Sequence, residues 1–236
     1  MYSITMAKIA VTDGMAEDAV LMLREAGHEV HLLGSQDELV DGFDAVVIRS
    51  ATKMTADAIA STPSLRLIGR AGVGVDNIDV DAATSAGILV CNTPSSSTQS
   101  VVELTIGHLL ASARYIPTAD RDLRNGEWTK KSLKGSELFG KNIGFIGFGR
   151  IAQGVGHVAK SLGMNLHAYD PYLPIEIAVD QQCVLHEDVE DVFRNCTHIA
   201  VHCNLTEETQ HLVNSHTLSL MPSIGADGIE CGNHLV

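Results

Sequence analysis

The chain has 236 residues, of which 45% are apolar and 19% charged, and its formal net charge is −13. This length suits one large or two ordinary domains, and the composition is typical of a globular protein with a packed core. The acidic balance argues against a nucleic-acid backbone or an anionic membrane as partner. The start of the chain lacks a secretory pattern and no apolar run reaches membrane-spanning length, so we expect a cytoplasmic protein.

Cysteine and histidine spacings give no sign of a metal site or a disulfide framework. The five cysteines form no C-x-x-C pair, and none of the eleven histidines falls in an H-E-x-x-H spacing. We therefore expect reduced thiols and no bound metal.

Short β-branched segments alternate with helical patterns in the first hundred residues. Two helices are expected, over Met15–Ala26 and Ala56–Ala60. The expected strands are Lys8–Val11, Glu29–Leu33, Asp44–Arg49, Leu65–Arg70 and Ile88–Cys91. Nearly continuous apolar strands separated by helices predict a parallel sheet that is covered on both faces.

A long helix is expected from Thr98 to Arg114, ended by Pro117 and followed by a polar, basic arm over Arg121–Lys134. Strand and helix patterns then alternate again. The expected elements are strands over Asn142–Ile146, Asn165–Tyr169, near Val184 and over His198–His202, and helices over Arg150–Leu162 and Val189–Phe193. The fold class predicted is α/β, with two doubly wound parallel-sheet domains, residues 1–98 and 99–236.

A G-x-G-x-x-A pattern at Gly147, Gly149 and Ala152 follows an apolar strand and opens a helix. In that context the first glycine permits a tight turn, the second lets a pyrophosphate approach the backbone, and the alanine allows close packing. The helix N-terminus offers N–H groups and a partial positive charge to phosphates. Asp170 ends the next strand, where a carboxylate can accept hydrogen bonds from ribose hydroxyls and would repel a 2′-phosphate. We therefore predict an NAD site rather than an NADP site.

A second glycine cluster, Gly72-Val73-Gly74, is a rival for the nucleotide site because it also follows a strand. No acidic residue ends the next strand, where Cys91 and Asn92 stand instead. This loop fits better as a source of backbone N–H groups for a small anion.

Seven segments together resemble a known family at matching spacings. They are VIRSATK (47–53), GRAGVGVDNIDVDAATSAGILVCNTP (69–94), SVVELTIGHLL (100–110), RNGEW (124–128), GKNIGFIGFGRIAQ (140–153), YDPY (169–172) and HCNLTEET (202–209). The resemblance is to the D-isomer-specific 2-hydroxyacid dehydrogenases, with the phosphoglycerate dehydrogenases the most similar branch. It implies a flavodoxin-like substrate domain and a Rossmann-type NAD domain, with the active site in the cleft between them. It also implies hydride transfer from C2 of a small 2-hydroxy acid to NAD, with 3-phosphoglycerate favoured.

The resemblance assigns roles to individual residues. Arg49 and Ser50 would hold the anionic end of the substrate, and the backbone N–H groups of Val73 and Gly74 would bind its carboxylate. The residues expected at the cofactor are Gly147, Gly149, Arg150, Ile151, Asp170 and Cys203. Two positions depart from the family pattern: Ser97 stands where an Asn is frequent, and Asn204 where a Pro is frequent.

The catalytic Arg, Glu and His of the family follow an apolar strand that begins here at His234-Leu235-Val236, where the chain ends. We therefore assign no catalytic residue within these 236 residues and expect the chain alone to have no dehydrogenase activity. His202, the nearest alternative base, is expected beside the nucleotide instead. Two other classes remain open: an NAD-sensing regulatory protein resembling a co-repressor, and an inactive truncated paralogue.

The helix Thr98–Arg114 is apolar on more than one side, as expected of a helix buried all round. Trp128 in the polar arm would be an exposed apolar anchor unless a partner covers it. We predict a homodimer through residues 98–135.

Overall fold

The computed structural model describes residues 6–236 and divides the chain into two compact units, Met1–Ser97 and Thr98–Val236. The start of the chain, considered above for a secretory pattern, includes residues 1–5, which lie outside the described part. Among residues 6–236, no helix is long and apolar enough to cross a membrane.

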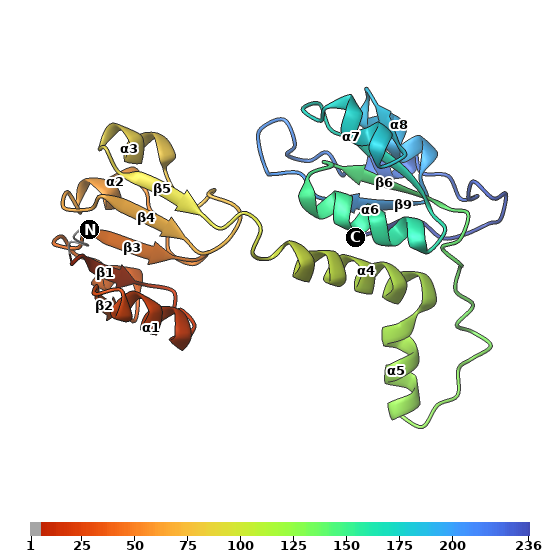
Figure 1. Ribbon diagram of the computed structural model, residues 1–236. Coiled ribbons are helices and arrows are strands. Elements are labelled where there is room, and N and C mark those ends of the chain that lie inside the picture. Colours follow the sequence, from red (N-terminus) through yellow and green to blue (C-terminus); the bar gives the residue numbers. More distant parts are fainter. Residues whose placement is uncertain (1–5) are drawn as a thin grey trace. The chain divides into compact units, whose positions relative to one another are not determined.

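The first unit is a five-stranded parallel sheet with helices on both faces (Figure 1). Its order β2-β1-β3-β4-β5 is the flavodoxin-like order. The strands are β1 (Lys8–Val11), β2 (Glu29–Leu32), β3 (Ala45–Ile48), β4 (Leu67–Arg70) and β5 (Leu89–Asn92). The helices are α1 (Glu17–Glu25), α2 (Ala56–Ala60) and α3 (Val80–Ser85), with a 3₁₀ turn at Gln36–Glu38.

The faces of this sheet are set by alternation along the strands. On β3, Val46 and Ile48 are fully buried against α2 and α3, whereas Val47 packs with α1 through Val20. Successive side chains of a strand point to opposite faces, so one short apolar strand supplies both cores.

The second unit is a five-stranded parallel sheet in the order β10-β9-β6-β7-β8, which is the Rossmann order. Its strands are β6 (Asn142–Ile146), β7 (Asn165–Tyr169), β8 (Cys183–His186), β9 (His198–Val201) and β10 (His234–Leu235). Its helices are α4 (Thr98–Arg114), α5 (Ile116–Arg124), α6 (Arg150–Ser161), α7 (Ile175–Asp180), α8 (Val189–Asn195) and α9 (Ser215–Ser219). The predicted fold class is confirmed, including the strand that begins at His234.

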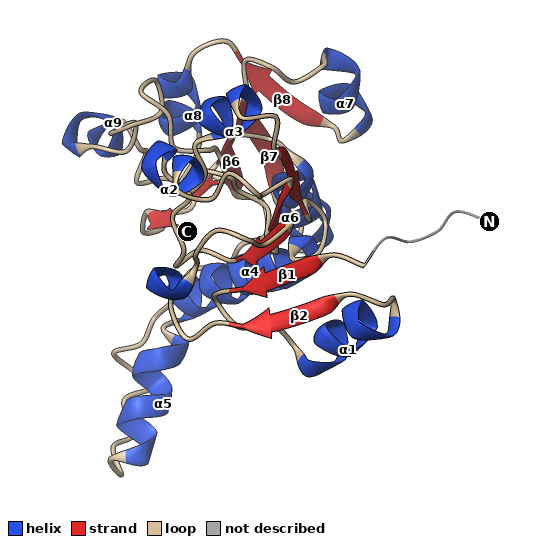
Figure 2. Cartoon of the chain, turned by 90° about the vertical axis from the view of Figure 1, so that its left-hand side faces the viewer, coloured by secondary structure: helices blue, strands red, loops and turns tan. Residues whose placement is uncertain are grey.

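Helices α4 and α6 cover one face of this sheet and α8 covers the other (Figure 2). Small residues allow close contact on both faces. A Cβ at Gly154 on α6 would lie 2.7 Å from Cγ2 of Val102 on α4, and one at Gly144 on β6 would lie 3.0 Å from Sγ of Cys196. These glycines are therefore packing residues, because a larger side chain would push the layers apart.

The prediction that Pro117 ends the long helix is wrong. Helix α4 ends at Arg114, and Tyr115 then adopts a left-handed conformation with φ of 52°. Pro117 lies in the first turn of a new helix, α5, so part of the expected arm is helical. Proline is well tolerated there because the first N–H groups of a helix have no partner within it.

Candidate functional site

The turn between β6 and α6 can be made only by glycine at position 147. Gly147 has φ of 83°, and a Cβ there would lie 2.8 Å from the backbone nitrogen of Cys203 and 2.9 Å from its Cα. The Gly147 N–H donates to the Tyr169 carbonyl at 2.9 Å, and the His202 N–H donates to the Ile146 carbonyl at 2.8 Å. The ends of β6, β7 and β9 therefore meet at this turn.

Gly149 stands at the N-cap of α6 in an extended conformation, and no heavy atom lies within 4 Å of where its Cβ would be. The first turn of α6 contains no acidic residue, and no side chain caps it. Arg150 is exposed, Ile151 is half-buried and Ala152 is completely buried. A helix N-terminus with this composition and open approach suits an anionic group.

Asp170 follows β7 and joins two backbone segments. Its Oδ2 accepts the N–H of Phe148 in the glycine turn at 2.8 Å, and its Oδ1 accepts the N–H of Tyr172 at 3.0 Å. The bond to Phe148 was not foreseen from the sequence, because it joins residues that only the folded sheet brings together. The carboxylate is thus fixed beside the glycine turn, at the position predicted for the ribose-binding acid.

Cys203 is half-buried at the exit of β9, where its backbone contacts Gly147. Burial raises the pKa of its thiol, and the negative charge of Asp170 raises it further. The side chain is therefore a neutral thiol that packs against the buried cluster containing Ile146 and Ile199. His202 beside it is also neutral, because burial lowers its pKa, and its Nε2 has no partner among residues 6–236.

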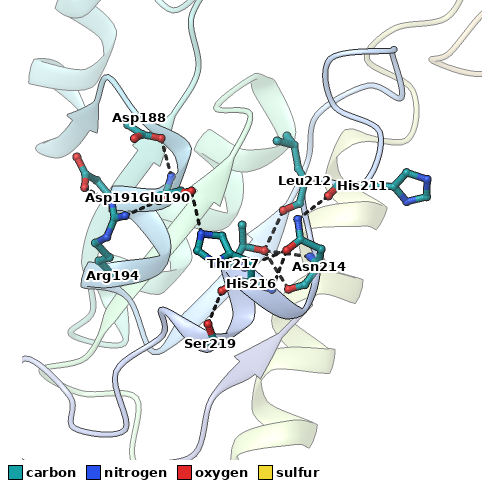
Figure 3. Close-up of polar contacts among 10 residues, drawn as sticks. All are labelled: Asp188, Glu190, Asp191, Arg194, His211, Leu212, Asn214, His216, Thr217 and Ser219. Carbon is teal, nitrogen blue, oxygen red and sulfur yellow. Dashed lines mark hydrogen bonds and ion pairs between the residues drawn. The ribbon is translucent and has the colours of Figure 1, made fainter.

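The segment that leaves β9 is held against α8 by a polar cluster (Figure 3). Asn214 caps α9, and its Oδ1 accepts the N–H groups of His216 at 2.8 Å and Thr217 at 3.1 Å. The hydroxyl of Thr217 in turn accepts the N–H of Asn214, which completes a capping box. His216 then contacts Glu190 of α8 at 3.1 Å. These contacts fix the far end of the segment that leaves β9 beside the glycine turn.

In the first unit, the loop after β3 carries Arg49 and Ser50, both exposed. Asp13 organises this loop. Its carboxylate accepts the N–H of Arg49 at 2.7 Å, and the N–H and hydroxyl of Thr52 at 3.0 and 2.6 Å. Burial acts to raise the pKa of Asp13, but these hydrogen bonds outweigh it and the pKa lies below its usual value. Sequence reasoning missed Asp13, which lies in no recognised pattern, and gave no role to Thr52, although Thr52 belongs to the segment VIRSATK.

The loop containing Val73 and Gly74 is bonded to its neighbours in the same unit. The amide of Asn92 donates to the Val73 carbonyl at 2.7 Å, and the amide of Asn77 donates to the carbonyls of Arg49 and Thr52 at 2.8 and 2.7 Å. The loops after β3, β4 and β5 thus form one hydrogen-bonded group. Helix α3 begins only at Val80, so the loop does not open a helix and lacks the context of a dinucleotide site.

No group of three or more His, Cys, Asp or Glu side chains within residues 6–236 is arranged to hold a metal ion.

The model of the D-isomer specific 2-hydroxyacid dehydrogenase NAD binding domain matches residues 106–225. The chain belongs to this family. Within this family, the chain is 46% identical over 220 residues to D-3-phosphoglycerate dehydrogenase of Methanocaldococcus jannaschii. The aligned region covers 92% of this chain and 42% of that protein. The chain is 41% identical over 222 residues to hydroxypyruvate reductase of Thermotoga maritima, covering 91% of this chain and 70% of that protein.

A solved structure of the TT0316 protein from Thermus thermophilus superposes with a TM-score of 0.81 at 27% identity, over 92% of this chain and 71% of that one. The predicted relationship to the family and its phosphoglycerate dehydrogenases is therefore confirmed. The chain spans about two fifths of the length of the Methanocaldococcus protein.

Proposed function

We propose that this chain carries the NAD site and part of the substrate site of a 2-hydroxyacid dehydrogenase, with 3-phosphoglycerate as the favoured substrate and 3-phosphohydroxypyruvate as product. Residues 1–98 would form the substrate domain and residues 99–236 the NAD domain. The observation that carries the proposal is the β6–α6 turn. Gly147 closes the turn and Gly149 leaves its outer side open before an uncapped helix N-terminus.

The cofactor residues fit NAD in chemical terms. The first N–H groups of α6, from Arg150 and Ile151 onward, would bind the pyrophosphate that approaches over Gly149. The carboxylate of Asp170 would accept the ribose hydroxyls, and the same negative charge would repel a 2′-phosphate. Cys203 would contact the cofactor as a small neutral group. NAD, when bound, supplies the hydride acceptor of the reaction.

The substrate residues lie at strand ends of the first unit. The guanidinium of Arg49 would form a fork on an anionic group, next to the hydroxyl of Ser50. No hydrogen bond within residues 6–236 uses the N–H of Val73 or Gly74, so both are available to a carboxylate. Anions at the carboxyl ends of parallel strands are typical of this class of sheet.

The test is binding of NADH and NADPH to the chain by calorimetry. We expect much tighter binding of NADH, and loss of most of that preference in Asp170→Ala. A second measurement is NADH formation from 3-phosphoglycerate, D-glycerate and D-lactate by the protein that contains this chain, where 3-phosphoglycerate should give the highest kcat/KM. Equal affinity of the unaltered chain for both cofactors would overturn the cofactor assignment.

We propose that the protein is a homodimer that associates through residues 98–135. Trp128 is 80% exposed and Leu123 is 61% exposed, and both lie on an arm that projects from α4 (Figure 2). The basic residues of this region are Arg114, Arg121, Arg124, Lys130, Lys131 and Lys134. Because the whole chain has a net charge of −13, a basic arm is complementary to the remaining surface of a second copy.

We also propose a reducing, cytoplasmic environment. All five cysteines are free thiols, and three of them, Cys183, Cys196 and Cys231, are buried. Burial raises the pKa of Cys183 to about 12, so this thiol stays protonated and unreactive.

A further inference from the structure

Gln153, one turn into α6, reaches back to the glycine turn. Its Nε2 donates to the carbonyl of Phe148 at 2.9 Å, and its backbone N–H donates to the carbonyl of Gly149, also at 2.9 Å. The backbone bond is the first of the helix, and any residue except proline would form it. The side-chain bond is different, because it requires a donor of the right length at position 153.

This side-chain bond sets the direction of the Gly149 N–H. The carbonyl of Phe148 and the N–H of Gly149 belong to one peptide group, and no peptide bond of residues 6–236 is cis. In a trans peptide these two groups point in opposite directions. Because the carbonyl is held towards α6, the Gly149 N–H points away from it and joins the N–H groups that the start of the helix presents. No hydrogen bond within residues 6–236 uses this N–H, and the space beside Gly149 is open.

The peptide between Phe148 and Gly149 needs such a contact. Phe148 itself is fixed, because its side chain is completely buried and its N–H donates to Asp170 at 2.8 Å. Gly149 has φ of −72°, but a glycine adopts positive φ about as readily. Gly149 therefore offers no steric resistance to a flip of the preceding peptide, and the Gln153 amide is the group that opposes it.

We propose that Gln153 is a positioning residue of the NAD site, which holds this peptide so that the Gly149 N–H faces the pyrophosphate. In the flipped peptide the carbonyl oxygen of Phe148 would face the pyrophosphate instead, and its partial negative charge would repel the phosphate oxygens. This inference rests on the proposed function. It goes beyond that function by assigning a residue that acts through the backbone and contacts neither the cofactor nor the substrate.

The test compares the unaltered 236-residue chain with two variants of similar side-chain length. Gln153→Met removes the donor, and Gln153→Glu replaces it by a carboxylate, which can only accept hydrogen bonds. Gln36→Met is the matched control, because the Gln36 amide also donates to a backbone carbonyl, that of Lys53 at 2.7 Å, but in the other unit. NADH affinity is measured by calorimetry. The amide resonance of Gly149 is followed without cofactor in chains labelled with ¹⁵N-glycine, and Gly149→Ala identifies that resonance.

We expect Gln153→Met to bind NADH about three- to tenfold more weakly, as the loss of one hydrogen bond predicts. Gln153→Glu should bind NADH more weakly still, because its carboxylate would repel the Phe148 carbonyl. In both variants the Gly149 resonance of the cofactor-free chain should shift, since its peptide is no longer held in one orientation. Gln36→Met should match the unaltered chain in both measurements. The Tm of each variant should stay within about 5 °C of that of the unaltered chain, which shows that the fold is retained.

Equal NADH affinity in Gln153→Met and Gln36→Met would overturn the proposal, as would a Gly149 resonance that does not move when the donor is removed. A Gln153→Glu chain that binds NADH as tightly as the unaltered chain would also overturn it. Absence of NADH binding by the unaltered chain would overturn the proposed function and not the orientation of the peptide, because the Gly149 resonance is recorded without cofactor.

Discussion

Replacing Gly147 by alanine should destabilise the second unit, whereas the same change at Gly149 should leave its stability nearly intact. Gly147 has φ of 83°, a conformation that costs an L-residue about 1–2 kcal/mol. Its new Cβ would also lie 2.8–3.0 Å from three backbone atoms of His202 and Cys203. Backbone cannot rotate away as a side chain can, so we add an overpacking cost of about 1–3 kcal/mol.

The total cost at Gly147 is therefore about 2–5 kcal/mol, a large part of the ~5–15 kcal/mol that stabilises an ordinary domain. For a unit of this size it corresponds to a fall in Tm of roughly 6–15 °C. Gly149→Ala meets no atom within 4 Å and keeps an ordinary φ of −72°, so its cost should stay below about 1 kcal/mol. Its methyl group would instead lie where we propose that the pyrophosphate approaches, so NADH should bind at least about tenfold more weakly.

Circular dichroism melting curves and NADH calorimetry on the two variants separate these effects. The Gly147 variant should melt early, and the Gly149 variant should melt normally but bind NADH poorly. A Gly147→Ala chain with unchanged Tm and unchanged NADH affinity would refute the assignment of this turn.

Asp170→Ala should weaken the binding of NADH much more than the binding of NADPH. Because the N–H groups of Phe148 and Tyr172 lose their acceptor in that variant, Asp170→Asn is the control that keeps one acceptor oxygen. NADPH binding that is unaffected by loss of the charge would contradict the proposed repulsion of the 2′-phosphate. Light scattering at micromolar concentration should give a dimer for the unaltered chain and a larger monomer fraction for Trp128→Ala. Tyr172→Ala is the control, because Tyr172 is an equally exposed aromatic residue outside the proposed interface. A monomeric unaltered chain would contradict the interface. Burial, followed by the charges of His234 and Lys141, lowers the pKa of His198 to about 3. Between pH ~6.5 and ~3 the unfolded chain therefore binds one more proton at this residue than the folded chain does. The free energy of unfolding should fall as the pH falls through that window. Urea unfolding should show a smaller loss from pH 7.5 to 5 in His198→Phe than in the unaltered chain, and equal losses would show that another group is responsible.

Elements with strong apolar periodicity were predictable from the sequence. The helix Thr98–Arg114 was predicted with the bounds that the structure has, because residues that become buried recur at helical spacing from Val102 to Ala113. The strands Lys8–Val11 and Asn142–Ile146 were also predicted with their observed bounds, since buried parallel strands are apolar runs of limited length.

Helices α3 and α9 were missed because their signals are local hydrogen bonds rather than periodicity, whereas the equally short α2 was predicted. Helix α3 has only one buried residue, Ala83, and α9 is five residues long. Both have N-caps that could have revealed them: Asp79 accepts the N–H of Ala82, and Asn214 and Thr217 form a capping box. The error at Pro117 had a related cause. A proline that follows the end of one helix and a proline in the first turn of the next helix have nearly the same local sequence.

At the candidate site, residue types were predictable but their contacts were not. Gly147 follows from the spacing of glycines after a strand, yet the contact of its Cα region with Cys203 joins segments far apart in the chain.

In each sheet, the side to which successive strands are added changes at the first strand of the unit. In the first unit the chain starts at β1 and winds outward to β2 on one side and to β3 on the other, and in the second unit it does so from β6 to β7 and β9. Adjacent connections that leave a parallel sheet in opposite directions open a crevice at its carboxyl edge. In the first unit the crevice is filled by the chain itself, because Asp13 after β1 accepts the N–H groups of Arg49 and Thr52 after β3. In the second unit the ends of β6 and β9 meet instead, because the absence of a side chain on Gly147 lets its backbone approach that of Cys203 closely. The same topological feature therefore gives a hydrogen-bonded platform under the proposed substrate residues in one unit and a tight backbone contact at the proposed nucleotide site in the other.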